Sequence, residues 1–474
     1  MKDEIANTLV SAHEAAVAPV METLDQDNRL TRDFVDRVLS ALDSGDDALA
    51  YQLVEPLHEA DIADLFELTP RDQRGPLAIS LGDLMSADVL AEVNDFVRED
   101  IIDALPAAQV ADMAGQMETD DAVAVLEDME EDEQQAILAE LNPEDRAAIE
   151  DALSYPDESA GRIMQRDLVA VPEHMSVGQL IDYLRDNQDL TTEFWEIFVV
   201  DPTHKPVGTC RLSWILRNPR DVQVSEIMET EQTLIPVDMD QEEVALRFQK
   251  YALISAAVVD ATGRLVGVIT ADDIVHIIQE EAGEDILRLS GAGEGDINEP
   301  ISDSYKSRVR WLIANLGTAM VASFIIAQFG AAIETMVALA VLMPIVASLG
   351  GNAGTQTLAV TVRALATNQL TQSNTRRAIF REIRVALLIG LTVAIVAGLG
   401  AGLWYQNWKL AAVIASAILF NILLAGLSGV TIPMILDKLD QDPAVSSSIF
   451  VTMITDSMGF LIFLSLAVAS GLAG

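Results

Sequence analysis

The 474-residue sequence has little cysteine, little lysine and little positive charge of any kind. Its one cysteine, Cys210, excludes an intramolecular disulfide and a cysteine-based metal cluster. Only 29 Lys and Arg residues stand against 74 Asp and Glu, a net charge of −45, and 6 of the 29 are lysines, as in salt-adapted proteins. Such an excess opposes binding to nucleic acid. The first 30 residues contain no continuous apolar run, so we expect no signal peptide.

The negative charge is unevenly distributed along the chain. Residues 1–304 carry a net charge of −49, whereas residues 305–474 carry a net charge of +4. Half of all residues are nevertheless hydrophobic, which excludes a disordered polyanion. The sequence therefore predicts an acidic soluble part followed by a nearly neutral, apolar part.

The apolar part contains five segments long enough to cross a bilayer as helices, for which about 20 apolar residues suffice. They are Trp311–Phe329, Ile333–Leu358, Val385–Trp404, Leu410–Leu436 and Val445–Leu472. Basic residues precede the first segment and fill the loop between the second and the third, which places these ends in the cytoplasm. We therefore expect a multi-pass protein of the cell (inner) membrane, with a cytoplasmic acidic part and the C-terminus on the outer side.

The second apolar segment carries an unusual polar motif. We expect Pro344 and the pair Gly350-Gly351 to break the helix, and exposed backbone at that depth is tolerated where it lines a watery cavity or is buried by protein. The freed carbonyls, together with Asn352 and Gln356, would be neutral oxygen ligands for a hard cation. A simple kink at a helix interface remains the alternative.

Asp456 is the one acidic residue in the interior of any of the five predicted segments, since Glu334 stands at the very start of the second. A carboxylate in hydrocarbon costs several kcal/mol, on the order of the insertion scales, so it should face a pore, a cation or a proton path. The alternative is a structural aspartate held by hydrogen bonds from Thr452 or Thr455.

The soluble part divides into two patterns. Residues 1–155 read as short amphipathic helices, and the similar stretches at 68–74 and 141–146, where Thr69 or Asn142 would cap a helix beginning with proline, predict a helical solenoid. Residues 156–285 alternate short β-rich runs with helices in two similar modules, about 159–222 and 223–285. A Gly-rich linker and a connecting helix at 286–310 then lead to a membrane domain at 311–474. The predicted fold class is multidomain: an all-α superhelical domain, a tandem α/β pair and a five-span membrane domain.

Specific motifs carry a family resemblance that covers essentially the whole chain. The segment "VVD…GRLVGVITADD" resembles a cystathionine-β-synthase-type (CBS) module. Together with "GGNAGTQ" and "DPA…TMITDSMGF" in the membrane part, the domain order resembles the MgtE family of magnesium channels. The resemblance implies a homodimer in a lipid bilayer, with a pore between two membrane domains and a hydrated Mg²⁺ near the paired Asp456 carboxylates.

The resemblance also implies three sets of ligands. The pore motif corresponds to Gly350, Gly351, Asn352, Gly354 and Gln356. Regulatory carboxylates that would bind cytosolic Mg²⁺ and close the pore correspond to Asp240, Glu242, Asp273, Glu281, Glu284 and Asp285, whereas His276 and Ala252 stand where other members can carry carboxylates. An adenine nucleotide, ATP among the candidates, would bind Thr270 and Asp273 of the second module; the first module has Arg211 and Trp214 instead, so we expect at most one nucleotide site per chain.

These patterns favour a Mg²⁺-selective channel for passive uptake that cytosolic Mg²⁺ closes, and not an enzyme. A Mg²⁺ sensor or scaffold without transport, and a broader carrier of Mn²⁺ or Co²⁺, remain alternatives. A CBS-bearing chloride channel would have more spans and would carry its CBS pair after them. An intramembrane aspartyl protease would need a second aspartate beside Asp456.

Overall fold

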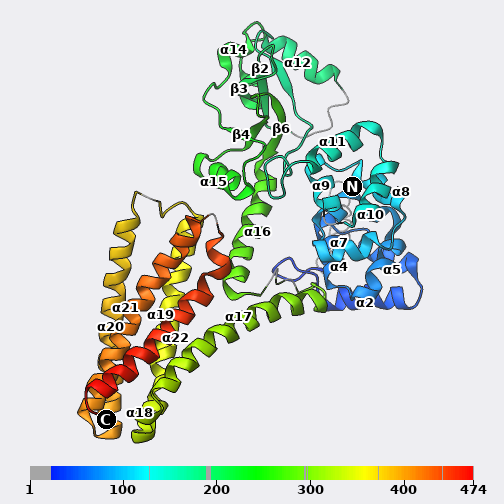
Figure 1. Ribbon diagram of the computed structural model, residues 1–474. Coiled ribbons are helices and arrows are strands. Elements are labelled where there is room, and N and C mark those ends of the chain that lie inside the picture. Colours follow the sequence, from blue (N-terminus) through cyan, green and yellow to red (C-terminus); the bar gives the residue numbers. More distant parts are fainter. Residues whose placement is uncertain are drawn as a thin grey trace, which may run out of the picture. The chain divides into compact units, whose positions relative to one another are not determined.

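The computed structural model describes residues 23–127, 129–187, 194–292, 295, 297–371, 373–439 and 441–472. The chain forms two units, residues 1–279 and residues 280–474 (Figure 1). The first unit combines a helical domain with two small mixed sheets, and the second consists of helices.

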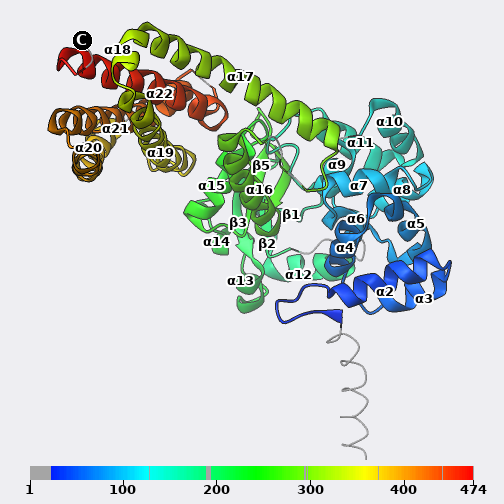
Figure 2. The same cartoon turned by 90° about the horizontal axis from the view of Figure 1, so that it is seen from below.

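The helical domain is a series of short helices around one apolar core. Figure 2 shows these helices from α2 to α11. Its elements are α2 (Arg32–Asp43), α3 (Asp47–Val54), α4 (Glu59–Leu68), α5 (Arg71–Leu81), the 3-10 helix η1 (Gly82–Leu84), α6 (Ala87–Glu92), α7 (Asp95–Ile102), α8 (Ala107–Ala114), α9 (Thr119–Glu127), α10 (Glu131–Glu140) and α11 (Pro143–Leu153). Helices α5, α7, α9 and α11 begin at intervals of 24 residues. The predicted superhelical domain is confirmed, and its repeat is a helix pair.

Arg98 and Arg146, which lie two 24-residue repeats apart, show how this solenoid is held together. The Arg98 guanidinium donates to the carbonyls of Leu90, Ala91 and Val93, at the end of α6. Arg146 donates in the same pattern to the end of α10. Each arginine thereby satisfies carbonyls that a helix end leaves without partners.

The two predicted helix caps have different outcomes. Asn142 caps α11 as expected, because its Oδ1 accepts from the backbone N–H groups of Glu144 and Asp145 at 3.0 Å. The predicted Thr69 cap is wrong. The Thr69 hydroxyl donates instead to the Leu65 carbonyl at 2.7 Å, because α5 begins one residue later than expected, at Arg71.

The two modules repeat one topology. The first contains β1 (Ala170–Pro172), α12 (Val177–Asp186), β2 (Glu196–Val200), β3 (Pro206–Arg211) and α13 (Leu212–Arg217). The second contains α14 (Val224–Ile227), β4 (Leu234–Pro236), α15 (Gln241–Tyr251), β5 (Ser255–Val259), β6 (Leu265–Thr270) and the start of α16 (Ala271–Ser290). Each sheet has one parallel and one antiparallel pair, in the orders β1-β2-β3 and β4-β5-β6.

Each sheet is extended by a segment from outside its own module. Gln165, which precedes β1, exchanges two backbone hydrogen bonds with Val268 of β6, at 2.8 and 2.9 Å. Glu229 does the same with Thr209 of β3. The first exchange fixes the entry to the first module beside the end of β6, where α16 begins.

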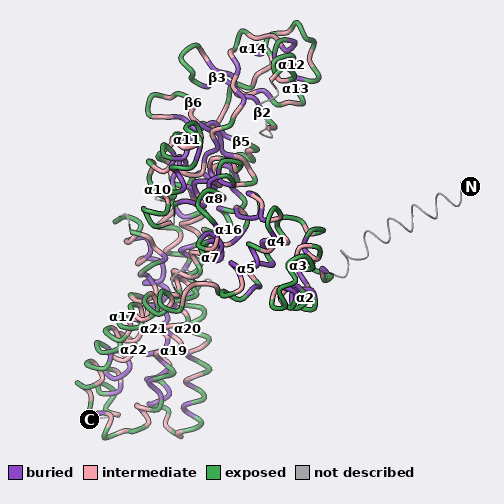
Figure 3. Tube along the Cα trace, turned by 90° about the vertical axis from the view of Figure 1, so that its right-hand side faces the viewer, coloured by how far each residue is buried: buried purple, intermediate pink, exposed green. Residues whose placement is uncertain are grey.

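The second unit contains five helices that are long and apolar enough to cross a membrane. They are α17 (Ile301–Gln328), α19 (Ala338–Ala366), α20 (Thr375–Tyr405), α21 (Trp408–Asp437) and α22 (Pro443–Ala469), with the short α18 (Gly330–Thr335) between the first two. Helix α21 is the most buried and packs on α19, α20 and α22, whereas α17 packs on α22 and is largely exposed (Figure 3). The predicted five-span class is confirmed.

The expected break in the second apolar segment is wrong. Helix α19 runs without interruption through Pro344 and Gly350-Gly351. Lipid offers no hydrogen bonds to freed backbone groups, so continuing the helix costs less than opening it, and a glycine costs a helix only about 1 kcal/mol. Gly350 and Gly354 serve close packing instead: a Cβ on Gly354 would lie 2.6 Å from a Val451 side-chain carbon of α22, whereas a Cβ on Gly351 would meet nothing within 4 Å.

Two helix starts also differ from expectation. The predicted connecting helix is continuous with the first apolar segment, as the single helix α17. Helix α20 begins ten residues before the predicted segment, so Glu382 lies inside a helix, where it is buried and paired with Arg381.

Candidate cation sites

Four carboxylates gather in the first unit where the helical domain meets the second module. Glu118, Asp120 and Asp121 stand at the start of α9, and Asp273 stands in the first turn of α16. We call these four residues the interdomain cluster. The Gln165 side-chain amide joins the two sides, donating to a Glu118 carboxylate oxygen and, at 3.3 Å, to Asp273 Oδ2.

Desolvation and mutual repulsion disfavour the charged forms of this cluster. Although Glu118 keeps contact with solvent, partial desolvation and the charge of Asp273 raise its pKa to about 7. Burial and the same Asp273 charge raise the pKa of Asp121 to about 6, against the lowering effect of Arg98. Burial raises the pKa of Asp120 well above its usual range, and Asp120 Oδ1 has no hydrogen-bond partner among the described residues.

Asp273 belongs to a second arrangement as well. Burial raises its pKa, while the Thr270 hydroxyl, which donates to Asp273 Oδ2 at 2.5 Å, acts in the opposite direction. The two residues predicted to read a nucleotide therefore lie together, at the junction of β6 and α16. In the first module, Arg211 lies over the Trp214 ring, 5.4 Å from its centroid, and pairs with Glu196.

A second group of charges lies in the second unit, around Arg288 near the end of α16. Arg288 pairs with Glu284 one turn earlier and, at 2.8 Å between Nη1 and Oδ2, with Asp442 at the start of α22. Burial and the Asp442 charge raise the pKa of Asp285, while Arg288 lowers it. Leu289 packs beside this group against the apolar ends of α19 and α22. We call Glu284, Asp285, Arg288 and Asp442 the α16 charge group.

The remaining predicted carboxylates belong to neither of these two groups. Glu281 lies on α16 one turn before Asp285. Asp240 is an exposed helix cap: its Oδ1 accepts from the backbone N–H of Glu242 at 2.9 Å, at the start of α15.

The predicted pore motif is divided between two sides of α19. Gly350 and Gly354 are buried against α21 and α22, whereas Asn352 and Gln356 are exposed and Gly351 is half-buried. Their carbonyls belong to a continuous helix, so the expected freed carbonyl ligands are not present in this structure. The exposed amides are the part of the motif that can reach an ion.

Asp456 lies in the middle of α22 and is half-buried. Among the described residues, none donates a hydrogen bond to its carboxylate or pairs with it. The Thr455 hydroxyl donates to the Thr452 carbonyl instead, at 3.1 Å. The hydrogen-bonded structural aspartate considered above is therefore not what the structure contains.

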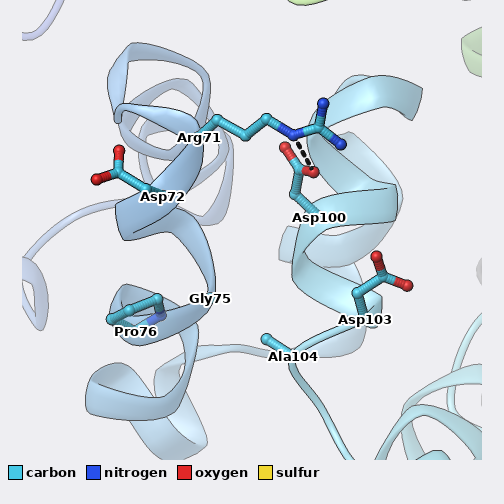
Figure 4. Close-up of a pocket in the computed structure, with 7 residues that line it drawn as sticks. All are labelled: Arg71, Asp72, Gly75, Pro76, Asp100, Asp103 and Ala104. Atoms are coloured by element: carbon cyan, nitrogen blue, oxygen red, sulfur yellow. Dashed lines mark hydrogen bonds and ion pairs between the residues drawn. The ribbon is translucent and has the colours of Figure 1, made fainter. Parts of the chain in front are cut away.

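One groove of the helical domain does not coincide with these positions. It has a volume of about 550 Å³ and lies between α5 and α7, where Arg71 reaches across to Asp100 (Figure 4). Asp100 accepts from Arg71 and from Arg74, both at 2.8 Å, so its two oxygens are already used in ion pairs.

Across the described residues, no three acidic, histidine or cysteine side chains converge closely enough to hold one ion. Sequence reasoning did not single out Glu118, Asp120, Asp121, Arg288 or Asp442. The start of α9 is one acidic run among many, and only its burial distinguishes it. Asp442 carried a weak signal, as an aspartate directly before a proline that begins a helix.

A helical domain, a pair of small mixed-sheet modules and five membrane-length helices define the class of an integral membrane transporter with an extramembrane part. Sequence families match in the same order: the MgtE intracellular N domain at residues 57–158, CBS domains at 160–213 and 224–280, and the MgtE divalent cation transporter domain at 343–466.

Three relatives are each described as magnesium transporter MgtE. That of Thermus thermophilus is 35% identical over 318 residues, covering 66% of this chain and 70% of the relative. That of Enterococcus faecalis is 32% identical and covers 67% and 70%, and that of Bacillus subtilis is 29% identical over 420 residues and covers 88% and 93%. The chain therefore belongs to the MgtE family of transporters, which are not enzymes.

Solved structures similar to this chain include the soluble part of a magnesium transporter, at 25% identity and a TM-score of 0.46, covering 53% of this chain and 98% of that one. Another is the cytosolic domain of the Mg²⁺ channel MgtE in complex with ATP, at 26% identity and a TM-score of 0.48, covering 51% and 99%.

Proposed function

We propose that this chain forms a Mg²⁺ channel, and the observation that carries the proposal is Asp456. A carboxylate without a partner in the middle of an apolar helix is costly unless a cation or water reaches it. The neighbouring helix α19 exposes Asn352 and Gln356, which supply neutral oxygens.

The channel is a homodimer in this proposal, with its pore on the two-fold axis. Two Asp456 carboxylates then face one ion, and the divalent charge relieves their mutual repulsion. Mg²⁺ holds its waters tightly and prefers octahedral oxygen, so carboxylates and amides can read the hydrated ion through its shell. The proposed pore residues are Asp456, Asn352 and Gln356, while Gly350, Gly351 and Gly354 of the same motif belong to the helix backbone that positions the two amides.

In this proposal, transport needs no energy source other than the electrical potential across the membrane. A divalent cation entering a cell gains roughly 4.6 kcal/mol per 100 mV of inside-negative potential, twice the value for a unit charge. We place the acidic part in the cytoplasm and the C-terminus outside, so that this passive influx is controlled from within.

Cytosolic Mg²⁺ closes the pore by neutralising the acidic part. The interdomain cluster joins the helical domain to the second CBS module, and a divalent ion there would favour the form in which they touch. The proposed regulatory carboxylates are Asp240, Glu242, Asp273, Glu281, Glu284 and Asp285. We add Glu118, Asp120 and Asp121 to this proposal, because the charge of Asp273 acts on each of them.

The second CBS module is further proposed to bind an adenine nucleotide such as ATP, because Thr270 and Asp273 lie together at its sheet edge. Asp273 would then serve both nucleotide and cation. Nucleotide binding to the purified protein that is lost in Thr270→Val would support this role.

Mg²⁺ flux into liposomes that contain the full-length protein tests the pore. Asp456→Asn should abolish flux, while Glu334→Gln, which removes an exposed carboxylate from α18, should leave it unchanged. Equal flux from wild type and Asp456→Asn would refute the pore assignment. No flux from the wild type would favour a Mg²⁺ sensor or scaffold, and equal rates for Mn²⁺ or Co²⁺ would make the chain a broader carrier.

A further inference from the structure

One amide lies fully buried at the point where three helices of the second unit meet. Asn421 stands in the middle of α21 with no solvent exposure. Its Nδ2 donates to the Val346 carbonyl of α19 at 2.9 Å, a hydrogen bond that links α21 to the helix carrying the polar motif.

Two glycines make room for this side chain. A Cβ on Gly350 of α19 would lie 2.1 Å from Asn421 Nδ2, and a Cβ on Gly459 of α22 would lie 2.6 Å from the same atom. Neither position can carry a side chain while Asn421 keeps its place. The amide is thus seated in notches of α19 and α22, the two helices that hold every proposed pore residue.

The surroundings of the amide are otherwise apolar. Val346, Ile418 and Ile422 are buried in the core cluster around it. Asn421 Oδ1 has no hydrogen-bond partner among the described residues, so the side chain carries an unmet polar atom that a leucine of similar shape would avoid. A buried polar group that fixes helix register at the expense of stability has this arrangement.

We infer that Asn421 is a positioning residue for ion conduction: it fixes the rotation of α19 and α22, and thereby the placement of Asn352 and Gln356 relative to Asp456. Gly350 and Gly354 share the buried side of α19, so locking that side on α21 determines which side is exposed. The residue itself touches no ion, because it is fully buried. This inference rests on the proposed pore.

The first experiment replaces the amide with an apolar residue of similar shape. Full-length Asn421→Leu is reconstituted in liposomes, and fluxes of Mg²⁺ and of Mn²⁺ are measured per folded protein. We expect Mg²⁺ flux to fall by about tenfold, as for the loss of one buried hydrogen bond, and the Mg²⁺ to Mn²⁺ ratio to move toward one, with an unchanged or raised unfolding temperature. A purely structural role would lower the unfolding temperature and leave the ratio alone, and that result would overturn the inference.

A second experiment keeps the inference testable if Asn421→Leu fails to fold. Gly350→Ala forces a methyl group against the amide and should reduce flux, and Asn421→Ala in the same chain frees the space and should restore part of the flux and of the ion ratio. Gly400→Ala on α20, where a Cβ meets nothing within 4 Å, is the matched control. Wild-type flux from Gly350→Ala, or no recovery in the double variant, would overturn the inference.

Measuring Asp456→Asn beside these variants distinguishes a failure of the pore assignment from a failure of the positioning role of Asn421. If Asp456→Asn keeps wild-type flux, the pore assignment fails and the inference fails with it. If Asp456→Asn abolishes flux while Asn421→Leu changes neither flux nor ratio, only the positioning role is refuted.

Discussion

The interdomain cluster and the α16 charge group are both crowded carboxylates, yet they are neutralised differently. In the first, the group between the carboxylates is the neutral amide of Gln165. In the second, the Arg288 guanidinium stands between Glu284 and Asp442. A site whose bridging group is neutral depends more strongly on ions or protons from solution than a site with an arginine between its carboxylates.

This difference assigns separate roles within the proposed gate. The interdomain cluster can report the concentration of a divalent ion, because its charged form is unfavourable until one arrives. The α16 charge group joins α16 to the start of α22 by a direct ion pair, so it can transmit a change of α16 without a metal of its own.

The largest expected effect is the loss of Mg²⁺-dependent stabilisation when the interdomain cluster is altered. At a Mg²⁺ concentration of 100 times Kd, binding to the folded state alone stabilises the wild type by about 2.7 kcal/mol. Thermal unfolding of full-length Asp120→Asn/Asp121→Asn should show almost none of this gain, and limited proteolysis should lose its protection by Mg²⁺. The control Glu140→Gln removes an exposed carboxylate from α10 of the same domain and should behave as wild type. Full Mg²⁺ stabilisation in the double variant would remove the cluster from the gate.

A smaller effect is expected from pH in the absence of divalent ions. Folding raises the pKa of Glu118 to about 7 and of Asp121 to about 6, so the folded state holds protons that the unfolded chain releases. This contribution to stability is fully present below the unfolded values of about 4 and is lost as the pH rises through the folded values. Unfolding in a chelator should therefore become easier between about pH 5 and pH 7.5, and Glu118→Gln should flatten the profile. A stability that rises over this range in the wild type and in Glu118→Gln alike would contradict the assignment.

Much of the fold was predictable because it depends on local pattern. The helix starts of the solenoid, the repeated strand-turn-strand units and the five apolar segments each follow from residue periodicity and from turn or cap residues near their ends. Thr69 shows the limit of such signals. Threonine is a residue type that often caps helices, but α5 begins one residue later than expected, and the Thr69 hydroxyl donates to the carbonyl of Leu65 in the preceding helix.

The sites were less predictable because they depend on burial and on contacts between distant segments. Asp120 differs from dozens of other acids only in being buried beside Asp273, 153 positions away in the chain. Pro344 and Gly350-Gly351 predict a break when read alone, yet the absence of water and the packing of α21 preserve the helix. Asn421 could have been noticed as a polar residue within an apolar segment, but its partners lie on two other helices.

The smallest expected effect separates the α16 charge group from the interdomain cluster most directly. Arg288→Gln removes the cation between Glu284 and Asp442, and because Arg288 and Asp442 each keep about a third of their side-chain exposure, the loss of stability should be only about 0.2–1 kcal/mol. The carboxylates left behind then resemble the interdomain cluster, so added Mg²⁺ should recover this loss. Arg247→Gln, which breaks an i,i+4 pair with Glu243 on α15, should lose a similar amount that Mg²⁺ does not recover. If the stability of Arg288→Gln proved as insensitive to Mg²⁺ as that of Arg247→Gln, the arginine would not be substituting for a metal, and the two carboxylate groups would differ in composition without differing in role.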